Sequence, residues 1–190
     1  MMTRRYLPSA LVFFVFPWLA GLFSPLSAVA GERWILVDTG AQTLDLMDGE
    51  RSLLHLESIA IGRGGTTRDK RQGDNRTPLG RFKVAWFNPN SRYHFFMGLD
   101  YPRREHVLRA HRRGLIDERE YRRLSQAMQS ARVPPQNTAL GGQIGIHGVG
   151  AGSEELHRIA NWTQGCVAVT NAEIEQLRRQ VSIGTTVVIR

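Results

Sequence analysis

The chain has 190 residues, of which 42% are hydrophobic and 22% are charged. This length fits one domain of ordinary size with a targeting segment, and the hydrophobic fraction excludes a disordered chain. The formal net charge is +8, and it falls to +6 without residues 1–30, which contain Arg4, Arg5 and no acidic residue. Such a basic surface is compatible with an anionic partner. No basic face interleaved with aromatic residues stands out, so we expect no nucleic acid.

The first 30 residues are predicted to be an export signal. Two arginines give a positive start, residues 11–22 are mostly apolar, and Ala28-Val29-Ala30 offers small residues for cleavage before Gly31. Residues 31–190 are therefore expected to form the working domain.

An uncleaved membrane anchor is the alternative, because residues 6–23 are nearly long enough to span a bilayer. Cleavage is favoured because the run is interrupted by Pro8, Pro17, Gly21 and Pro25. Either way we expect the domain outside the cytoplasm, in the periplasm or cell envelope.

Short strands dominate the first half of this domain. Alternating or apolar segments predict strands at residues 34–38, 43–47, 53–61 and 81–87. Thr39–Gln42 is a hairpin turn between the first two. Residues 62–80 are polar and Gly-rich and predict a loop, in which Asp74 and Asn75 are turn-forming residues and not catalysts.

Residues 101–133 predict a helical insertion. Pro102 opens one helix, which reaches about His111, and Asp117 with Glu120 forms a capping box for a second helix. An apolar face on the second helix is supplied by Leu115, Ile116, Tyr121, Leu124 and Met128. The Arg-rich opposite face is interpreted as solvated surface, with a substrate-facing role as the alternative.

The remaining elements are short. Strands are predicted at residues 143–148, 166–169 and 185–189, and a helix from Asn171 as N-cap to about Gln180. The sequence thus predicts a mainly β domain with a helical insertion around residues 101–133 and a helix after Cys166.

Cys166 is the only cysteine, so it has no partner for an internal disulfide. A buried, inert thiol is the alternative to a reactive one, and the count alone does not decide between them. Its neighbours favour a nucleophile. Gly165 lets backbone N–H groups approach a substrate, the N–H of Cys166 is a natural oxyanion donor, and the Thr163 hydroxyl adds a donor or orients a base.

A thiol of ordinary pKa needs a histidine as its base near neutral pH. His147 is the candidate, because it ends a strand between Gly145 and Gly148 and its ring can project into a cleft. Structural or exposed roles are assigned to His55, His94, His106, His111 and His157. No metal is expected, since neither H-x-x-x-H nor C-x-x-C spacing occurs.

These residues carry a family resemblance. Ile146-His147-Gly148, followed 19 residues after the histidine by the nucleophile in Thr-x-Gly-Cys-Val, resembles the L,D-transpeptidase (YkuD-type) catalytic domain. The resemblance covers about residues 33–190. It includes the Gly-Asp-x-x-Thr-Pro-x-Gly turn at residues 73–80 and Asn171 after Ala-Val-Thr.

The resemblance implies a β-sandwich-like fold with a Cys–His pair in an open cleft and no cofactor. Cys166 would attack the carbonyl between meso-diaminopimelate and D-Ala of a peptidoglycan stem peptide, with His147 as base and then acid. The N–H groups of Gly165 and Cys166 would form the oxyanion hole, supported by Thr163. Candidates for substrate binding are Gly148, Trp162, Gln164 and Arg158. The thioester would pass to an amine, either free or on an envelope protein, and a monomer is expected.

The sequence departs from the family pattern at two positions. Gln164 stands where the family often has histidine, and Ala168 stands where it usually has an arginine suited to a substrate carboxylate. Arg158 or an arginine of the insertion is the candidate substitute. The form here resembles a branch with a helical insertion, some members of which hydrolyse wall linkages.

Three functions are compared for this pattern of residues. We favour transpeptidation, with hydrolysis of the same bond class by an L,D-peptidase as the alternative, because the Cys–His pair serves both. A catalytically silent wall-binding module is the second hypothesis, although a binder has no use for a free thiol. A redox protein would need a resolving cysteine, and the chain has none.

Overall fold

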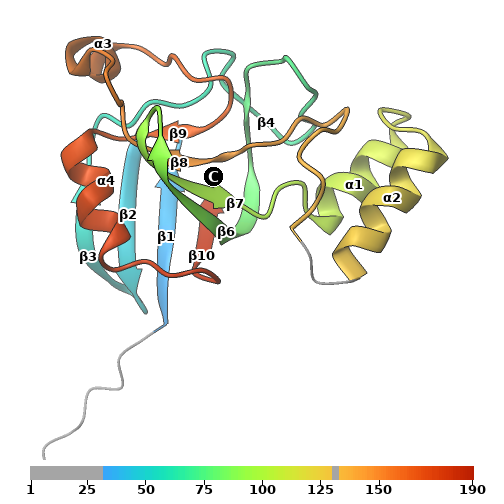
Figure 1. Ribbon diagram of the computed structural model, residues 1–190, viewed down its shortest axis with the longest axis horizontal. Helices are drawn as coiled ribbons and strands as arrows, with labels where there is room; N and C mark the ends of the chain where they lie inside the picture. The colour runs from blue at the N-terminus through green and yellow to red at the C-terminus, as the bar shows by residue number, and fades with distance from the viewer. Residues whose placement is uncertain (1–31, 130–132) are drawn as a thin grey trace, which may run out of the picture.

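The computed structural model describes residues 32–129 and 133–190. The strands are β1 (Arg33–Asp38), β2 (Thr43–Asp48), β3 (Arg51–Leu56), β4 (Thr66–Thr67), β5 (Thr77–Pro78), β6 (Gly80–Ser91), β7 (His94–Leu99), β8 (Gly145–His147), β9 (Val167–Ala168) and β10 (Thr186–Ile189). The helices are α1 (Arg104–Arg112), α2 (Glu118–Gln129), α3 (Glu154–Ile159) and α4 (Asn171–Arg178). The predicted mainly β fold with a helical insertion is confirmed (Figure 1).

Eight strands form one sheet in the order β3-β2-β1-β10-β6-β7-β8-β9. The long strand β6 belongs to both halves of this sheet. Its residues 80–83 pair with β10, and its residues from Val84 onward pair with β7 across two register shifts. Such bulges bend a strand and increase its twist, so the two halves can turn toward one another.

The segment after β3 connects the two ends of the sheet. Ala60 pairs with Ala168 of β9, and Gly62 pairs with Thr163, which lies shortly before β9. The chain that leaves one edge of the sheet is therefore hydrogen-bonded to the strand at the other edge. This closure forms the base on which the candidate site is built.

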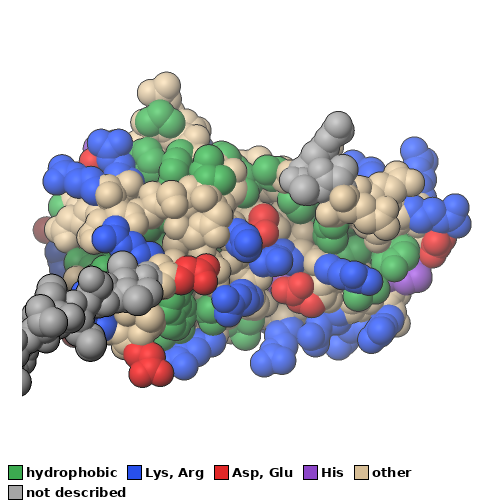
Figure 2. Space-filling view, turned by 90° about the horizontal axis from the view of Figure 1, so that it is seen from below, with side chains coloured by type: hydrophobic (Ala, Val, Ile, Leu, Met, Phe, Trp, Pro, Cys, Tyr) green, Lys and Arg blue, Asp and Glu red, His purple; other side chains and the backbone are tan. Residues whose placement is uncertain are grey.

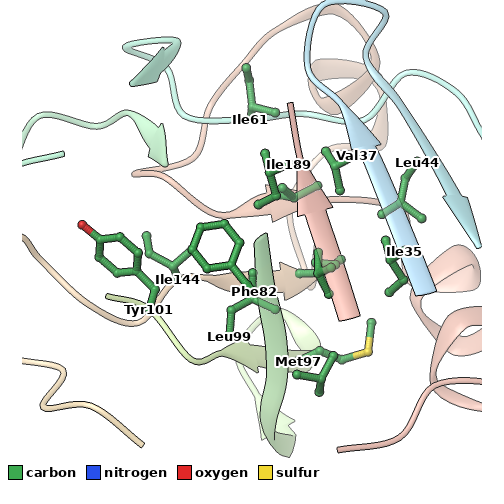
Figure 3. Close-up of a cluster of buried hydrophobic side chains, with 14 of the residues drawn as sticks. Ile35, Val37, Leu44, Ile61, Phe82, Met97, Leu99, Tyr101, Ile144 and Ile189 are labelled. Carbon is green, nitrogen blue, oxygen red and sulfur yellow. The ribbon is translucent and has the colours of Figure 1, made fainter. Parts of the chain in front are cut away.

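The core lies between the two halves of the sheet. Ile35 and Val37 of β1 and Leu44 of β2 are fully buried, as the alternation of apolar residues predicts. In Figure 3 they lie together with Phe82, Met97, Leu99 and Ile189, which come from β6, β7 and β10. Tyr101 joins this cluster, and its hydroxyl donates to the Leu140 carbonyl at 2.9 Å.

The helical insertion lies at one end of the molecule and α4 at the other (Figure 1). Leu124 of α2 is fully buried and Asp117 caps that helix, accepting a hydrogen bond from the Glu120 N–H at 2.7 Å. The Glu120 carboxylate pairs with Arg123 instead of completing a capping box. The Arg-rich face of the insertion is exposed at Arg112, Arg113, Arg119, Arg122 and Arg123. Figure 2 likewise shows Lys and Arg side chains interspersed with acidic ones on the face seen from below.

The structure corrects three details of the predicted elements. The third strand ends at Leu56, and the following residues contribute single bridges. Thr170, and not Asn171, is the N-cap of α4, because its hydroxyl accepts from the Glu173 N–H and the Glu173 carboxylate completes the capping box. Strand β7 was not predicted from the sequence, because the polar residues directly before it make its apolar pattern hard to recognise.

Within residues 32–129 and 133–190, no helix is both long enough and apolar enough to cross a membrane. The predicted signal segment, residues 1–30, lies outside the described residues.

Replacing Leu124 tests how much the packing of the insertion against the core contributes to the free energy of unfolding. Leu124→Ala should lower the free energy of unfolding by about 2–5 kcal/mol, the usual cost of truncating a fully buried leucine. Leu156→Ala on α3 is the matched control, because that side chain is 52% exposed. We expect the control to change stability by about 0.5 kcal/mol or less. Urea denaturation of both variants measures the difference, and equal losses would contradict the packing described here.

Candidate active site

The parallel pairing of β8 with β9 brings His147 and Cys166 together. His147 pairs with Ala168, and Cys166 lies two residues before Ala168. Because side chains alternate along a strand, Cys166 and His147 are on the same face of the pair. With ideal strand spacings, this register would offset their Cα atoms by about 6.6 Å along the strands and about 4.8 Å across them. Both side chains line one cleft with a volume of about 720 Å³.

The orientation of His147 fixes which ring nitrogen carries the proton. Nδ1 lies 2.7 Å from the Gly148 carbonyl oxygen, which can only accept a hydrogen bond. Nδ1 is therefore the protonated nitrogen, and Nε2 keeps a free lone pair. Burial lowers the pKa of His147 to about 4, with smaller contributions in the same direction from the charges of His157 and Arg92. The ring is thus neutral at pH 7 and able to accept a proton at Nε2.

Three aromatic side chains hold the His147 ring. Tyr93 stacks on it at a centroid distance of 4.2 Å, Phe96 lies nearly parallel at 5.9 Å, and Trp162 contacts it edge-on at 5.7 Å. Trp162 also donates from Nε1 to Nδ1 of the buried His157 at 3.3 Å. These contacts remove the imidazole from water, which explains its lowered pKa.

The Cys166 thiol is half-buried and uncharged in this structure. Its S–H donates to the Gln143 carbonyl at 3.2 Å, and not to His147. Burial raises the pKa of the thiol to about 11, although a backbone hydrogen bond from Gly145 and the charge of Lys70 act in the opposite direction. The resting pair is therefore a neutral thiol and a neutral imidazole, and not a preformed ion pair.

A tight turn presents the thiol. The Thr163 hydroxyl donates to the Cys166 carbonyl at 2.7 Å and accepts from the Gly165 N–H at 3.1 Å. Gly165 has φ +134°, and a Cβ there would lie 2.7 Å from the Arg76 carbonyl, so only glycine fits. The expected oxyanion role of the Gly165 N–H is therefore corrected, because this donor is already used within the turn. The Cys166 N–H makes no hydrogen bond to the described residues and remains the candidate donor.

The structure brings some predicted site residues into the cleft and leaves others outside. Trp162, Thr163 and the exposed Gln164 line it beside Cys166 and His147. Gly148 is buried behind the cleft, where its carbonyl orients His147. Arg158 is exposed on α3 and does not line the cleft. Its neighbour His157 faces inward, and successive helical side chains diverge by about 100°.

Other cleft residues were not found from the sequence. Arg63, Lys70 and Arg92 supply positive charge, whereas no Asp or Glu of the described residues lines this cleft. Lys70 lies four residues before Asp74, which is the one pattern that could have indicated it. No pattern in the neighbouring sequence marks Tyr93 as a cleft residue, because its contact with His147 forms only in the folded chain.

In the part of the chain that the structure describes, no three His, Cys, Asp or Glu side chains are grouped so that they could hold a metal ion.

The lone thiol of Cys166 directly precedes β9, and His147 ends β8, the parallel neighbour of β9, in a mainly β domain. The model of the YkuD family, the L,D-transpeptidase catalytic domain, matches residues 32–189, so the chain belongs to this family.

Two solved structures show the same fold. Pgp2 from Campylobacter jejuni, a helical cell shape determining protein, is 22% identical with a TM-score of 0.56, over 84% of this chain and 47% of Pgp2. Bd1075 from Bdellovibrio bacteriovorus is 18% identical with a TM-score of 0.52, over 85% of this chain and 48% of Bd1075. The chain thus spans about half the length of each. No curated protein sequence matches it.

The neutral resting pair predicts how Cys166 reacts with an alkylating agent. Because the thiolate is the reactive form and the pKa of Cys166 is raised to about 11, the rate with iodoacetamide should increase about tenfold per pH unit between pH 7 and pH 10. Intact-protein mass spectrometry measures the rate at this single cysteine, and Cys166→Ala is the blank. A plateau reached below pH 8 would instead indicate a preformed thiolate–imidazolium pair.

Proposed function

We propose that this protein is an exported peptidoglycan L,D-transpeptidase that forms an acyl-enzyme on Cys166. The observation that carries the proposal is the free Nε2 of His147 on the same strand face as the only thiol, in a shared cleft. A base of this kind serves a thiol nucleophile, and the family supplies the reaction class.

Acylation begins with proton transfer from the thiol to His147. Sγ turns from the Gln143 carbonyl toward Nε2 and gives up its proton as it attacks the stem-peptide carbonyl. The Cys166 N–H donates to the oxyanion of the tetrahedral intermediate. The imidazolium then protonates the leaving D-Ala amine, which departs as the carbon–nitrogen bond breaks and leaves a thioester.

An amine of a second stem peptide or of an envelope protein completes the reaction. His147 removes a proton from this amine as it attacks the thioester, and Cys166 regains its proton when the thiol leaves. Hydrolysis by an L,D-peptidase is the alternative, in which water takes the place of the amine. Both outcomes remodel the wall, and on its likeness to Pgp2 we extend the proposal to a role in cell shape.

The charge of the cleft supports an anionic substrate. Stem peptides carry carboxylates, and Arg63, Lys70 and Arg92 line the cleft, whereas no Asp or Glu of the described residues lines it. Of the three cations, Lys70 is paired with Asp74, which lies outside the cleft lining. Ala168, at the position where the family usually has arginine, is fully buried and paired with Ala60. These three cations, rather than Arg158, are the proposed substitutes for that arginine.

Purified muropeptides test the reaction. The chain without residues 1–30 should convert tetrapeptide stems into 3→3-linked dimers, and Cys166→Ala should leave them unchanged. Mass spectrometry of the products separates the alternatives. Shortened stems without dimers would establish the hydrolase, and no change with either protein would contradict acyl transfer on this substrate.

Replacing His147 tests the base. His147→Ala should slow acylation of Cys166 by about 10²-fold or more, the usual scale for loss of a general base. A carbapenem is the probe expected from the family resemblance, and its adduct is followed by intact-protein mass. The matched control is His94→Ala, because His94 is exposed at the start of β7 and does not line the cleft. Acylation at the wild-type rate in His147→Ala would exclude this role.

A further inference from the structure

A buried lysine lies beside the candidate nucleophile. The side chain of Lys70 is 4% exposed and its ammonium lies 2.7 Å from the Asp74 carboxylate. A buried ion pair is seldom a net source of stability, because the loss of hydration offsets the attraction between the charges. The burial of Lys70 in the lining of the cleft therefore requires another explanation.

The ammonium lies against the turn that carries Cys166. A Cβ placed on Gly165 would be 3.1 Å from Lys70 Nζ, and one placed on Gly141 would be 3.5 Å from Lys70 Cε. Because Gly165 and Gly141 have no side chain, the space beside them is free for the side chain of Lys70. The chain has only two lysines, Lys70 and Lys83, among its 25 basic residues. A compact ammonium fits this enclosed position better than the broad guanidinium that the chain uses elsewhere.

The hydrogen bonds of this pair leave donors unused. Asp74 accepts from Lys70, from the Arg71 N–H and from the Arg76 N–H, so its carboxylate is held firmly in place. Burial raises the pKa of Asp74, but these hydrogen bonds outweigh burial and the pKa is lowered overall. An ammonium has three donors, and Asp74 is the one hydrogen-bond partner of Lys70 among the described residues. Two N–H groups of the ammonium thus have no hydrogen-bond partner among the described residues.

The other charged groups around the thiol do not exert the same electrostatic effect on Cys166 as the ammonium of Lys70. His147 is neutral near pH 7, and the buried His157 does not line the cleft and accepts a hydrogen bond from Trp162. Arg63 and Arg92 line the cleft but are exposed, so water screens their charge. Lys70 is the side-chain charge that acts on the ionisation of Cys166.

We propose that Lys70 is a positioning residue of this site, whose buried ammonium, held by Asp74, stabilises the negative charge on Cys166 Sγ as the thiol loses its proton. The proton moves from Sγ to Nε2 of His147, and Lys70 keeps its own proton and forms no bond to sulfur. The inference depends on the proposed nucleophile but not on the proposed substrate.

The pH dependence of Cys166 alkylation by iodoacetamide tests this role. Lys70→Met should move the ionisation of the thiol to higher pH and slow alkylation at pH 8 by about tenfold, the effect of one pKa unit. Lys83→Met is the matched control, since Lys83 is exposed on β6 and outside the cleft. An unchanged profile in Lys70→Met would overturn the proposal.

Asp74→Asn separates an electrostatic role from a structural one. This substitution removes the negative charge of Asp74 and leaves the ammonium of Lys70 in place, so the pH profile of alkylation should move to lower pH. The expected shift is opposite in direction to that of Lys70→Met. If the Lys70–Asp74 pair only stabilised the loop, the pH profiles of both variants would shift in the same direction. That result would overturn the proposal. If Lys70→Met does not fold, the direction in Asp74→Asn decides alone. Because iodoacetamide needs no peptidoglycan, these results stand apart from those with muropeptides.

Discussion

His147 and Cys166 share a cleft because β8 and β9 pair in one register, and the rest of the site depends on that register. A slip by one residue would turn Cys166 to the opposite face, since side chains alternate with a period of two. The pairing is secured from both sides. The Val169 N–H donates to the His147 carbonyl, and Ala168 exchanges two backbone hydrogen bonds with Ala60. The closure of the sheet is thus what places a thiol and its base together.

Burial has opposite effects on the two partners and keeps both neutral. The aromatic side chains around His147 lower its pKa, while enclosure of the thiol raises the pKa of Cys166. A neutral thiol resists oxidation better than a thiolate, but it is a weaker nucleophile. A fixed cation close to sulfur offsets part of this cost without creating a permanent ion pair. The ammonium of Lys70 is suited to this role because it is shielded from water.

The sequence was sufficient to predict those elements whose characteristic pattern lies within a few neighbouring residues. Alternation of apolar residues identified β1 and β2, and the glycines around His147 and Cys166 marked the turns that present them. Features that depend on folding were missed. Lys70 is 96 residues before Cys166, so nothing in its neighbourhood indicates a thiol nearby. Gly148 is a candidate for substrate binding by the family resemblance, whereas the hydrogen bond between its carbonyl and His147 could not be predicted from the sequence.

The segment that follows the helical insertion lines the cleft, whereas the Arg-rich face of the insertion does not. Gln136 accepts from the Gln143 N–H at 2.7 Å and donates from Nε2 to the carbonyls of Tyr101 and Pro134. Gln143 is held with φ +53°, a conformation that costs energy for a residue other than glycine. Its carbonyl is the acceptor of the Cys166 thiol. The amide of Gln136 therefore fixes the group that holds the resting thiol.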